Sequence, residues 1–373
     1  MLPKTTDIVI IGGGVIGCLV AYHLAKHQVQ VLVLDRSRFG SNASGATVGV
    51  ISPFWHVDPT IDAMWNLGVR SLELFPSLAA ELTESGIDPE FRQSGVLKLA
   101  FTENQVEELK RNLSWQSPLD TSVVWLDTDG LLERDPAVNP QVLGGVLTPN
   151  EGYVRGQRLV DSLVQAATIL GVTFFEDTEV LSLRRNGNKV TGVNTPIGSV
   201  SSEQVLIAAG PWSGIHTNWF GEESSTRIPI RPVKGERILL RKPGFLPKTP
   251  VRNFDAYVVP QLNGDILVGA TREESRFDQI VTADGVRRMV DAAVLSYPNL
   301  ADAEFVSGRS GVRPATPDGM PVLGPVQTIQ GLSIASGHDS VGIMLSPATA
   351  ELLSQYLLDG NAGPLEPFRL SRF

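Results

Sequence analysis

Residues 7–17 read DIVIIGGGVIG, and this segment decides how the first part of the chain can fold. The run Asp7–Ile11 is almost wholly apolar, which is typical of a strand buried on both faces of a parallel sheet. Three glycines follow at the spacing G-x-G-x-x-G, and a helical pattern leads to a second apolar run, Val29–Leu34, that ends at Asp35. Together these features predict a βαβ unit of about 30 residues.

The glycine triplet, Gly12, Gly14 and Gly17, is suited to binding a pyrophosphate. Glycine lets the strand turn tightly, and a side chain at Gly14 would block the approach of the anion, which faces the positive end of the following helix. Asp35 lies 21 residues after Gly14, where a carboxylate can accept hydrogen bonds from ribose hydroxyls. The order of these features predicts a dinucleotide site, although the spacing alone does not separate NAD from FAD.

The composition excludes several other classes of protein. Of the 373 residues, 42% are hydrophobic and 19% charged, an ordinary balance for a globular chain. The net charge of −9 argues against a nucleic-acid partner or an anionic membrane surface. The single cysteine, Cys18, allows no internal disulfide, and we expect no metal site. The longest apolar run, Ile8–Val20, is too short for a transmembrane segment and follows no basic region, so we expect a cytoplasmic protein.

Weaker patterns mark the rest of the chain. Helices are predicted at 64–85, where Pro76 should kink or divide the helix, and at 103–113, 159–170 and about 346–358. Asn-Gly pairs at 186–187 and 263–264 predict two β-hairpins.

Dinucleotide-type elements therefore occur at both ends of the chain, with hairpin-rich segments between them. This order predicts an α/β fold with an α+β insertion. A discontinuous Rossmann-like nucleotide-binding domain would comprise residues 1–85, 150–225 and 305–373. A substrate domain with a mixed, largely antiparallel sheet would comprise 86–149 and 226–304.

Several segments resemble the D-amino-acid-oxidase-type superfamily of FAD-dependent oxidoreductases. After the βαβ unit, residues 42–50 (NASGATVGV) are similar to the loop that crosses the FAD pyrophosphate in that group. Residues 207–213 (IAAGPWS) resemble its A-x-G-x-W-S turn, and 311–319 (GVRPATPDG) its G-x-R-P-x-T-x-D-G segment. Residues 337–347 resemble its last flavin loop. The resemblance covers essentially the whole chain and is greatest to glycine oxidase and its amine-oxidising relatives.

The resemblance implies a noncovalently bound FAD, since Cys18 follows the glycine triplet and lies far from the expected position of the isoalloxazine. The backbone amides of the loop 337–342 would meet the edge of the flavin that becomes negative on reduction. The implied cofactor-binding residues are Gly12, Gly14, Val15, Gly17, Asp35, Arg36, Ala43, Ser44, Val48, Gly49, Val50, Val180, Ala209, Gly210, Trp212, Gly337, His338, Asp339, Ser340, Val341, Gly342, Ile343 and Met344.

Two residues are the implied catalytic pair. Arg313 would bind the substrate carboxylate, because a guanidinium fork matches a planar carboxylate; the alternative is a structural ion pair. Tyr257 would lie over the flavin, and the alternative is a half-buried strand aromatic. The pair Trp55-His56 is a further candidate for the pocket wall. Where glycine oxidases carry another basic residue near the substrate, this chain has Asp339 and Ser340, which weakens a glycine-specific interpretation.

The function implied is oxidation of the C–N bond of a small amino acid or N-substituted amino acid. A hydride would pass from Cα to the flavin and leave an imine, with oxygen, which forms peroxide, or a partner subunit as electron acceptor. The alternatives are the flavin β-subunit of an opine, proline or cyanide-forming glycine dehydrogenase, a 2-hydroxy-acid dehydrogenase, and a non-catalytic flavoprotein subunit. We expect an oligomer, and the exact substrate, stereochemistry and acceptor stay open.

The purified protein is expected to be yellow and to release FAD, not FMN, on acid precipitation. Asp35→Ala should weaken FAD retention by roughly 1–3 kcal/mol, because ribose hydroxyls lose their acceptor. Chromatography of the released flavin and titration of the apoprotein with FAD measure both effects. A colourless protein that binds NAD with micromolar affinity would contradict the assignment.

Overall fold

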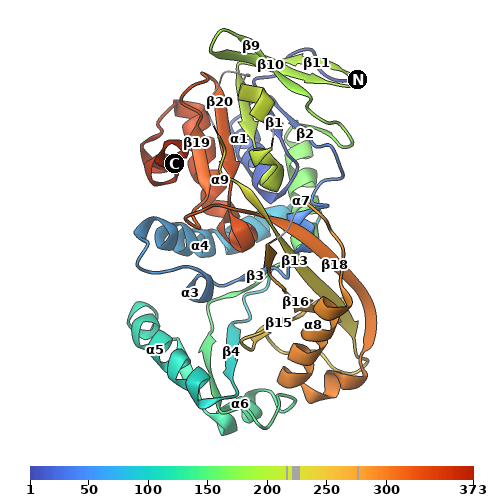
Figure 1. The fold of residues 1–373 in the computed structure, drawn as a ribbon, viewed down its shortest axis with the longest axis vertical. Helices are drawn as coiled ribbons and strands as arrows, with labels where there is room; N and C mark the ends of the chain where they lie inside the picture. Colours follow the sequence, from blue (N-terminus) through green and yellow to red (C-terminus); the bar gives the residue numbers. More distant parts are fainter. Residues whose placement is uncertain (216, 221–226, 275–276) are drawn as a thin grey trace.

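The computed structural model describes residues 1–373 apart from 216, 221–226 and 275–276, and its described elements form two parts that each contain a large sheet (Figure 1). The first sheet has the strand order β19-β20-β12-β1-β2-β8, and only the β19–β20 pair is antiparallel. Its strands are β1 (Ile8–Ile11), β2 (Val31–Leu34), β8 (Thr173–Phe175), β12 (Gln204–Ile207), β19 (Val322–Pro325) and β20 (Leu332–Ser336). The predicted βαβ unit lies inside this sheet.

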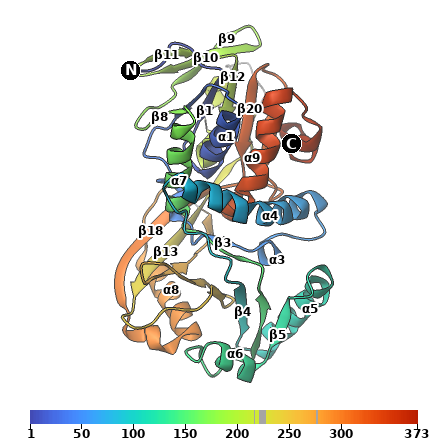
Figure 2. The ribbon, with the colours of Figure 1, turned by 180° about the vertical axis from the view of Figure 1, so that it is seen from behind.

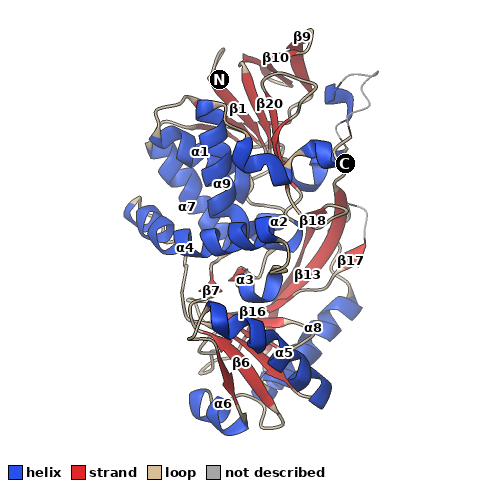
Figure 3. Ribbon diagram, turned by 90° about the vertical axis from the view of Figure 1, so that its left-hand side faces the viewer, coloured by secondary structure: helices blue, strands red, loops and turns tan. Residues whose placement is uncertain are grey.

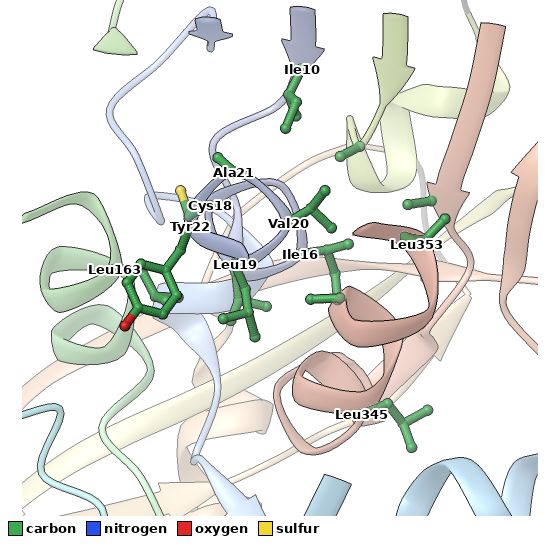
Figure 4. Packing of buried hydrophobic residues seen from close by; sticks show 14 of the residues in the cluster. Ile10, Ile16, Cys18, Leu19, Val20, Ala21, Tyr22, Leu163, Leu345 and Leu353 are labelled. Carbon is green, nitrogen blue, oxygen red and sulfur yellow. The ribbon is translucent and has the colours of Figure 1, made fainter. Parts of the chain in front are cut away.

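The two faces of β1 belong to different hydrophobic cores, as expected for a strand with side chains that alternate between faces. Ile8 and Ile10 pack against one set of helices, and Figure 4 shows Ile10 directed toward the helix that carries Val20 and Ala21. These helices are α1 (Val15–Lys26), α4 (Asp62–Glu84), α7 (Gly156–Ile169) and α9 (Gly342–Asp359). Val9 and Ile11 face the other way. They share that core with the small sheet β9 (Ser182–Asn186), β10 (Lys189–Thr195) and β11 (Gly198–Ser201).

The second sheet has the order β17-β13-β16-β15-β14-β4-β6-β5, with β18 paired to β13 (Figure 2). Its strands are β4 (Val96–Ala100), β5 (Val124–Leu126), β6 (Gly144–Thr148), β13 (Arg231–Arg241), β14 (Val251–Arg252), β15 (Tyr257–Pro260), β16 (Asp265–Gly269), β17 (Glu273–Glu274) and β18 (Glu304–Ala315). Figure 3 shows helices α5 (Glu103–Leu119), α6 (Thr128–Arg134) and α8 (Ala283–Ser296) around it.

Both predicted hairpins form: β9 pairs with β10, and β15 with β16, each antiparallel. Of the two outcomes predicted for Pro76, division of the helix is wrong, since α4 runs unbroken from Asp62 to Glu84, and a kink stays a prediction. Pro76 is exposed, while Phe75 and Leu78 beside it are buried in the core, so packing outweighs the cost of proline. The last helix, α9, begins at Gly342, before the predicted start near Ser346, although Pro347 lies within it.

Strand β18 crosses the domain boundary that the sequence predicted at residue 305. Its pairing with β13 runs from Glu304 to Ala315, which makes it part of the second sheet. The pattern that surrounds Arg313 resembles a flavoenzyme motif, but motif resemblance does not reveal which sheet a strand joins. We propose that the substrate domain extends to Ala315 and that the nucleotide-binding domain resumes after it.

Two further searches concern only the part of the chain that the structure describes. No helix there is long and apolar enough to cross a membrane. The same residues contain no cluster of three or more His, Cys, Asp or Glu side chains that could hold a metal ion. Cys18 is buried in α1, and burial raises the pKa of its thiol.

The helix α1 is pressed against the turn that follows β1. A Cβ added at Gly17 would lie 2.0 Å from the carbonyl oxygen of Gly12, so no side chain fits between them. Gly12 itself has a φ of +115° and lies against the backbone of Ala208. The spacing of the triplet thus reflects close backbone packing as well as anion binding.

Gly17→Ala is expected to destabilise the protein by about 1–3 kcal/mol, because the new methyl group pushes α1 away from the turn. Thermal unfolding measures the effect. Gly130→Ala in α6 is the matched control: its Cβ would come no closer than 3.2 Å to another group, the side chain of Asp127, so it should leave the unfolding midpoint unchanged or slightly raised. Equal midpoints for Gly17→Ala and the wild type would show that α1 can relax.

Candidate active site

A long pocket runs between the two sheets and collects segments from most of the chain. Its walls come from the ends of β1, β2 and β12, the first turns of α1 and α9, the helix α2 (Ala43–Ala46), and the strands β15, β16 and β18. The pocket lies at the carboxyl ends of the parallel strands, where open α/β sheets bind their ligands. The end near α1 is called here the nucleotide end, and the end near Arg313 and Tyr257 the substrate end.

Two helices direct their N-termini to this pocket, and no acidic residue in their first turns neutralises the partial positive charge of these ends. Gly14 caps α1 and Val341 caps α9, and neither provides a capping side chain. The first turn of each helix has no acidic residue, so the partial positive charge of both helix ends is available to an anion. Ser44 from α2 accepts a hydrogen bond from Val15 N at 3.0 Å, which fixes α2 against this helix end.

Asp35 lies at the tip of β2 and lines the nucleotide end. Its carboxylate accepts hydrogen bonds from the amides of Gly13, at 2.7 Å, and Ser37, at 2.8 Å. Burial raises the pKa of Asp35 despite these two bonds. Each oxygen keeps a free lone pair, so the residue can hold the glycine turn and accept a ribose hydroxyl together. Beside it, the guanidinium of Arg36 lies 4.1 Å from the ring centroid of Trp212.

The loop 42–50 is held by arginines from the other sheet, which the sequence analysis did not identify. Arg237 on β13 donates to the carbonyls of Gly45 and Ala46, both at 3.1 Å. Arg309 on β18 donates to the carbonyl of Ser41 at 2.6 Å. The alternation of side chains along these strands could have predicted that both arginines lie on one face of the sheet. It could not have predicted that they contact a segment more than 180 residues away in the chain.

The chemistry of this pocket fits FAD. A pyrophosphate would meet the start of α1, whose first turn has no acidic residue, the ribose would meet Asp35, and the start of α9 would lie beside the flavin. Most sequence-predicted cofactor residues lie on the pocket wall, but five do not: Gly17, Gly49, Gly337, Val341 and Met344. Gly49 and Gly337 pack tightly on Val154 and Thr316, and Met344 is buried in the core. Direct contact between these five and the cofactor stays a prediction.

Arg313 lines the substrate end and is held by backbone carbonyls. One terminal nitrogen of its guanidinium, Nη1, donates to Thr271 O at 3.0 Å and to Lys234 O at 3.2 Å. The described residues include no carboxylate that forms an ion pair with it, so the alternative of a structural ion pair has no support here. Burial lowers the pKa of Arg313. Gly235 makes room for this side chain, because a Cβ there would lie 2.2 Å from the guanidinium.

The buried Tyr257 and the half-buried His56 form a pair in the same wall. The hydroxyl of Tyr257 lies 3.1 Å from His56 Nε2. Burial lowers the pKa of His56 to about 3 and raises that of Tyr257 to about 12, so both are neutral at pH 7. Trp55, the other candidate, is not part of the wall: Lys98 Nζ lies 4.7 Å from the centroid of its ring instead.

His56 is positioned by the short helix α3 (Pro53–His56). The buried carboxylate of Glu151 accepts hydrogen bonds from the Ser52 hydroxyl and from Phe54 N, at 2.9 Å, and so fixes the start of this helix. Burial raises the pKa of Glu151 to about 7.

The unusual Asp339 has a partner that the sequence did not predict. Its carboxylate forms two hydrogen bonds of 2.9 Å with Arg272, which lies just beyond β16. Both residues and Ser340 line the pocket, and Arg272 is about half exposed. A basic side chain thus reaches this part of the pocket from another strand, already paired with an acid.

Comparison with known proteins agrees with this site. Residues 7–356 match the family described as FAD dependent oxidoreductase. Glycine oxidase from Geobacillus kaustophilus is 34% identical over 373 residues, covering 98% of this chain and 97% of that protein. Hydrogen cyanide synthase subunit HcnC from Pseudomonas aeruginosa is 31% identical, covering 100% and 97%. The crystal structure of the Geobacillus kaustophilus glycine oxidase superposes with a TM-score of 0.90 at 33% identity and covers all of both chains.

These matches extend over nearly the whole chain and agree with a pocket that fits a flavin dinucleotide. The predicted α/β fold with its inserted substrate sheet is confirmed by the same similarity. The chain therefore belongs to the family of FAD-dependent oxidoreductases.

Proposed function

We propose that this protein oxidises the C–N bond of a small amino acid or N-substituted amino acid. The observation that carries the proposal is Arg313, a half-buried guanidinium in the pocket wall without a carboxylate partner among the described residues. Burying an unpaired cation is costly, so such a group is best explained by an anionic ligand. A substrate carboxylate fits the guanidinium fork.

The pocket residues provide binding and orientation rather than strong acid–base catalysis. Arg313 binds the carboxylate and so fixes Cα relative to the pocket wall. Bound FAD would supply the two-electron acceptor for the hydride that leaves Cα. His56 and Tyr257 are neutral, and the tyrosine is buried, so they shape a pocket of low polarity beside the reacting carbon. Once the ammonium group of the substrate has released a proton to solvent, the neutral amine can lose a hydride and become an iminium with no further proton transfer.

This last point favours an amine over a 2-hydroxy acid. An alcohol must lose its hydroxyl proton as the hydride leaves, which calls for a base of suitable pKa. The imidazole beside Tyr257 in the pocket wall, that of His56, has a pKa of about 3 and is a weak base. A scaffold role is disfavoured as well, because a non-catalytic subunit has no need of a carboxylate-binding arginine.

The remaining alternatives, a self-sufficient oxidase and the flavin subunit of a dehydrogenase, differ in their electron acceptor. Similarity to a hydrogen cyanide synthase subunit favours a partner chain, whereas similarity to glycine oxidase favours oxygen. A cytoplasmic location and an oligomeric state are part of the proposal and depend on the composition and on these relatives.

Arg313→Ala is expected to lower kcat/KM for the amino-acid substrate by about a hundredfold to several thousandfold. The change removes two charge-assisted hydrogen bonds of about 1.5–3 kcal/mol each. Arg313→Lys should restore only part of the activity, since a point charge cannot reproduce the fork. Steady-state kinetics with the amino acid and its decarboxylated amine analogue measure the effect, and the amine should lose little.

Arg309→Ala is the matched control, four residues away on β18. Because Arg309 holds Ser41, directly before the loop 42–50, its loss should reduce FAD retention, whereas Arg313→Ala should keep a normal flavin content. Near-normal activity of Arg313→Ala on its amino acid, or loss of FAD from it, would overturn the proposed role.

The acceptor can be tested on the isolated chain after anaerobic reduction by its amino acid. Rapid reoxidation in air with formation of peroxide is expected of a self-sufficient oxidase. Slow reoxidation in air but rapid reoxidation by an artificial dye is expected if a partner subunit takes the electrons. Stopped-flow absorbance of the flavin distinguishes the two.

A further inference from the structure

A second guanidinium without a carboxylate partner, that of Arg252, lines the substrate end of the pocket. Among the described residues, no ion pair or hydrogen bond to a carboxylate reaches it. Arg252 is half-buried at the end of the short strand β14. Its position in the pocket is not explained by the binding of one carboxylate at Arg313.

The orientation of Arg252 is fixed by stacking. In the β14–β15 pair, Arg252 lies directly opposite Tyr257, and opposed residues project from the same face of a sheet. The guanidinium carbon lies 5.0 Å from the centroid of the Tyr257 ring. The tyrosine is held in turn by its contact with His56. A cation–π contact positions the arginine but leaves its charge and most of its N–H groups free for a ligand.

Neighbouring groups do not cancel this charge. Burial and, to a smaller extent, the positive charge of the nearby Arg252 lower the pKa of Lys98 to about 8. Glu108 lies 3.7 Å from Lys98 and balances that ammonium rather than the guanidinium. Asp255 lines the pocket but is exposed and forms no ion pair with Arg252.

Asp339 in the pocket wall, and Glu151 behind it, are also engaged. Asp339 is bound by Arg272 through two hydrogen bonds. Glu151 is buried, with a pKa raised to about 7, and is bonded to α3. The substrate end therefore presents two unneutralised guanidinium groups, those of Arg313 and Arg252.

The sheet order separates these two groups. Going from β18 through β13, β16 and β15 to β14, Arg313 lies on the first strand, Tyr257 on the fourth and Arg252 on the last. A substrate that contacts both arginines must therefore extend past the Tyr257–His56 pair.

We propose that Arg252 binds a second carboxylate of the substrate, so that the preferred substrates are amino acids with two carboxylates. This inference rests on the proposed function, because Arg313 is taken to hold the carboxylate next to the reacting carbon. The second carboxylate can belong to the side chain or to a substituent on the nitrogen. In both cases the group that Arg252 would bind is a carboxylate.

Binding without turnover tests Arg252 directly. Calorimetric titration of the FAD-containing protein with glutarate and with glutaramate, its monoamide, compares a second carboxylate with a neutral group of similar shape. The wild type should bind glutarate roughly tenfold to a hundredfold more tightly. Arg252→Met, which keeps an apolar contact with the tyrosine ring, should reduce the ratio to within about twofold. The exposed Arg287→Met on α8, which removes the same charge, should keep the wild-type ratio.

A wild-type ratio near one, or an unchanged ratio in Arg252→Met, would overturn the proposal. If no amino acid reduces the flavin, the proposed function fails, whereas the glutarate titration still decides the role of Arg252.

The source of the second carboxylate is identified by anaerobic flavin reduction with two matched pairs. Glutamate against glutamine tests the side chain, and N-(2-carboxyethyl)glycine against its carbamoyl analogue tests the nitrogen substituent. A tenfold or larger preference for the acid in either pair, lost in Arg252→Met, supports the proposal and assigns the source. Equal reduction by acid and amide in both pairs contradicts it.

Discussion

The extended pairing of β13 with β18 is the constraint on which the site depends. Its register sets Arg309 opposite Arg237 and Arg313 opposite Val233. Side chains four residues apart on a strand project from the same face, and their Cα atoms are separated by roughly 13 Å. One end of this span holds the loop 42–50, and the other carries the proposed carboxylate ligand. The pairing thus sets the distance between the cofactor loop and the substrate anchor.

The distribution of charge in the molecule also favours the binding of anions in the pocket. The protein as a whole is acidic, with a net charge of −9, yet its pocket gathers arginines and the positive ends of two helices. Backbone carbonyls satisfy the guanidinium N–H groups of Arg237, Arg309 and Arg313 without neutralising them. Such groups keep their attraction for anions in a partly desolvated wall, where electrostatic interactions are strong. The cofactor and the substrate are both anionic, and their negative charges would offset the positive charge of the pocket.

The sequence was sufficient for features set by short-range rules. The βαβ unit and the two Asn-Gly hairpins follow from periodicity and turn chemistry, and both form as expected. Features that arise from long-range packing were not predictable in this way. Nothing local shows that buried neighbours keep α4 continuous through Pro76, or that β18 joins the second sheet. Arg252 and Arg237 were missed for the same reason, since their importance depends on strands that are distant in the chain.

Asp339 shows why a substitution in a motif has to be judged with its structural partner. From the sequence alone, Asp339 in place of the base that the resemblance implies weakens a glycine-specific interpretation. In the structure Arg272, just beyond β16, forms an ion pair with Asp339 in the pocket wall. The substitution therefore neither repels a substrate carboxylate strongly nor attracts one. Under the proposals made above, selection among anionic substrates depends on Arg313 and Arg252, which lie on strands on either side of Tyr257 and form no ion pair with a described carboxylate.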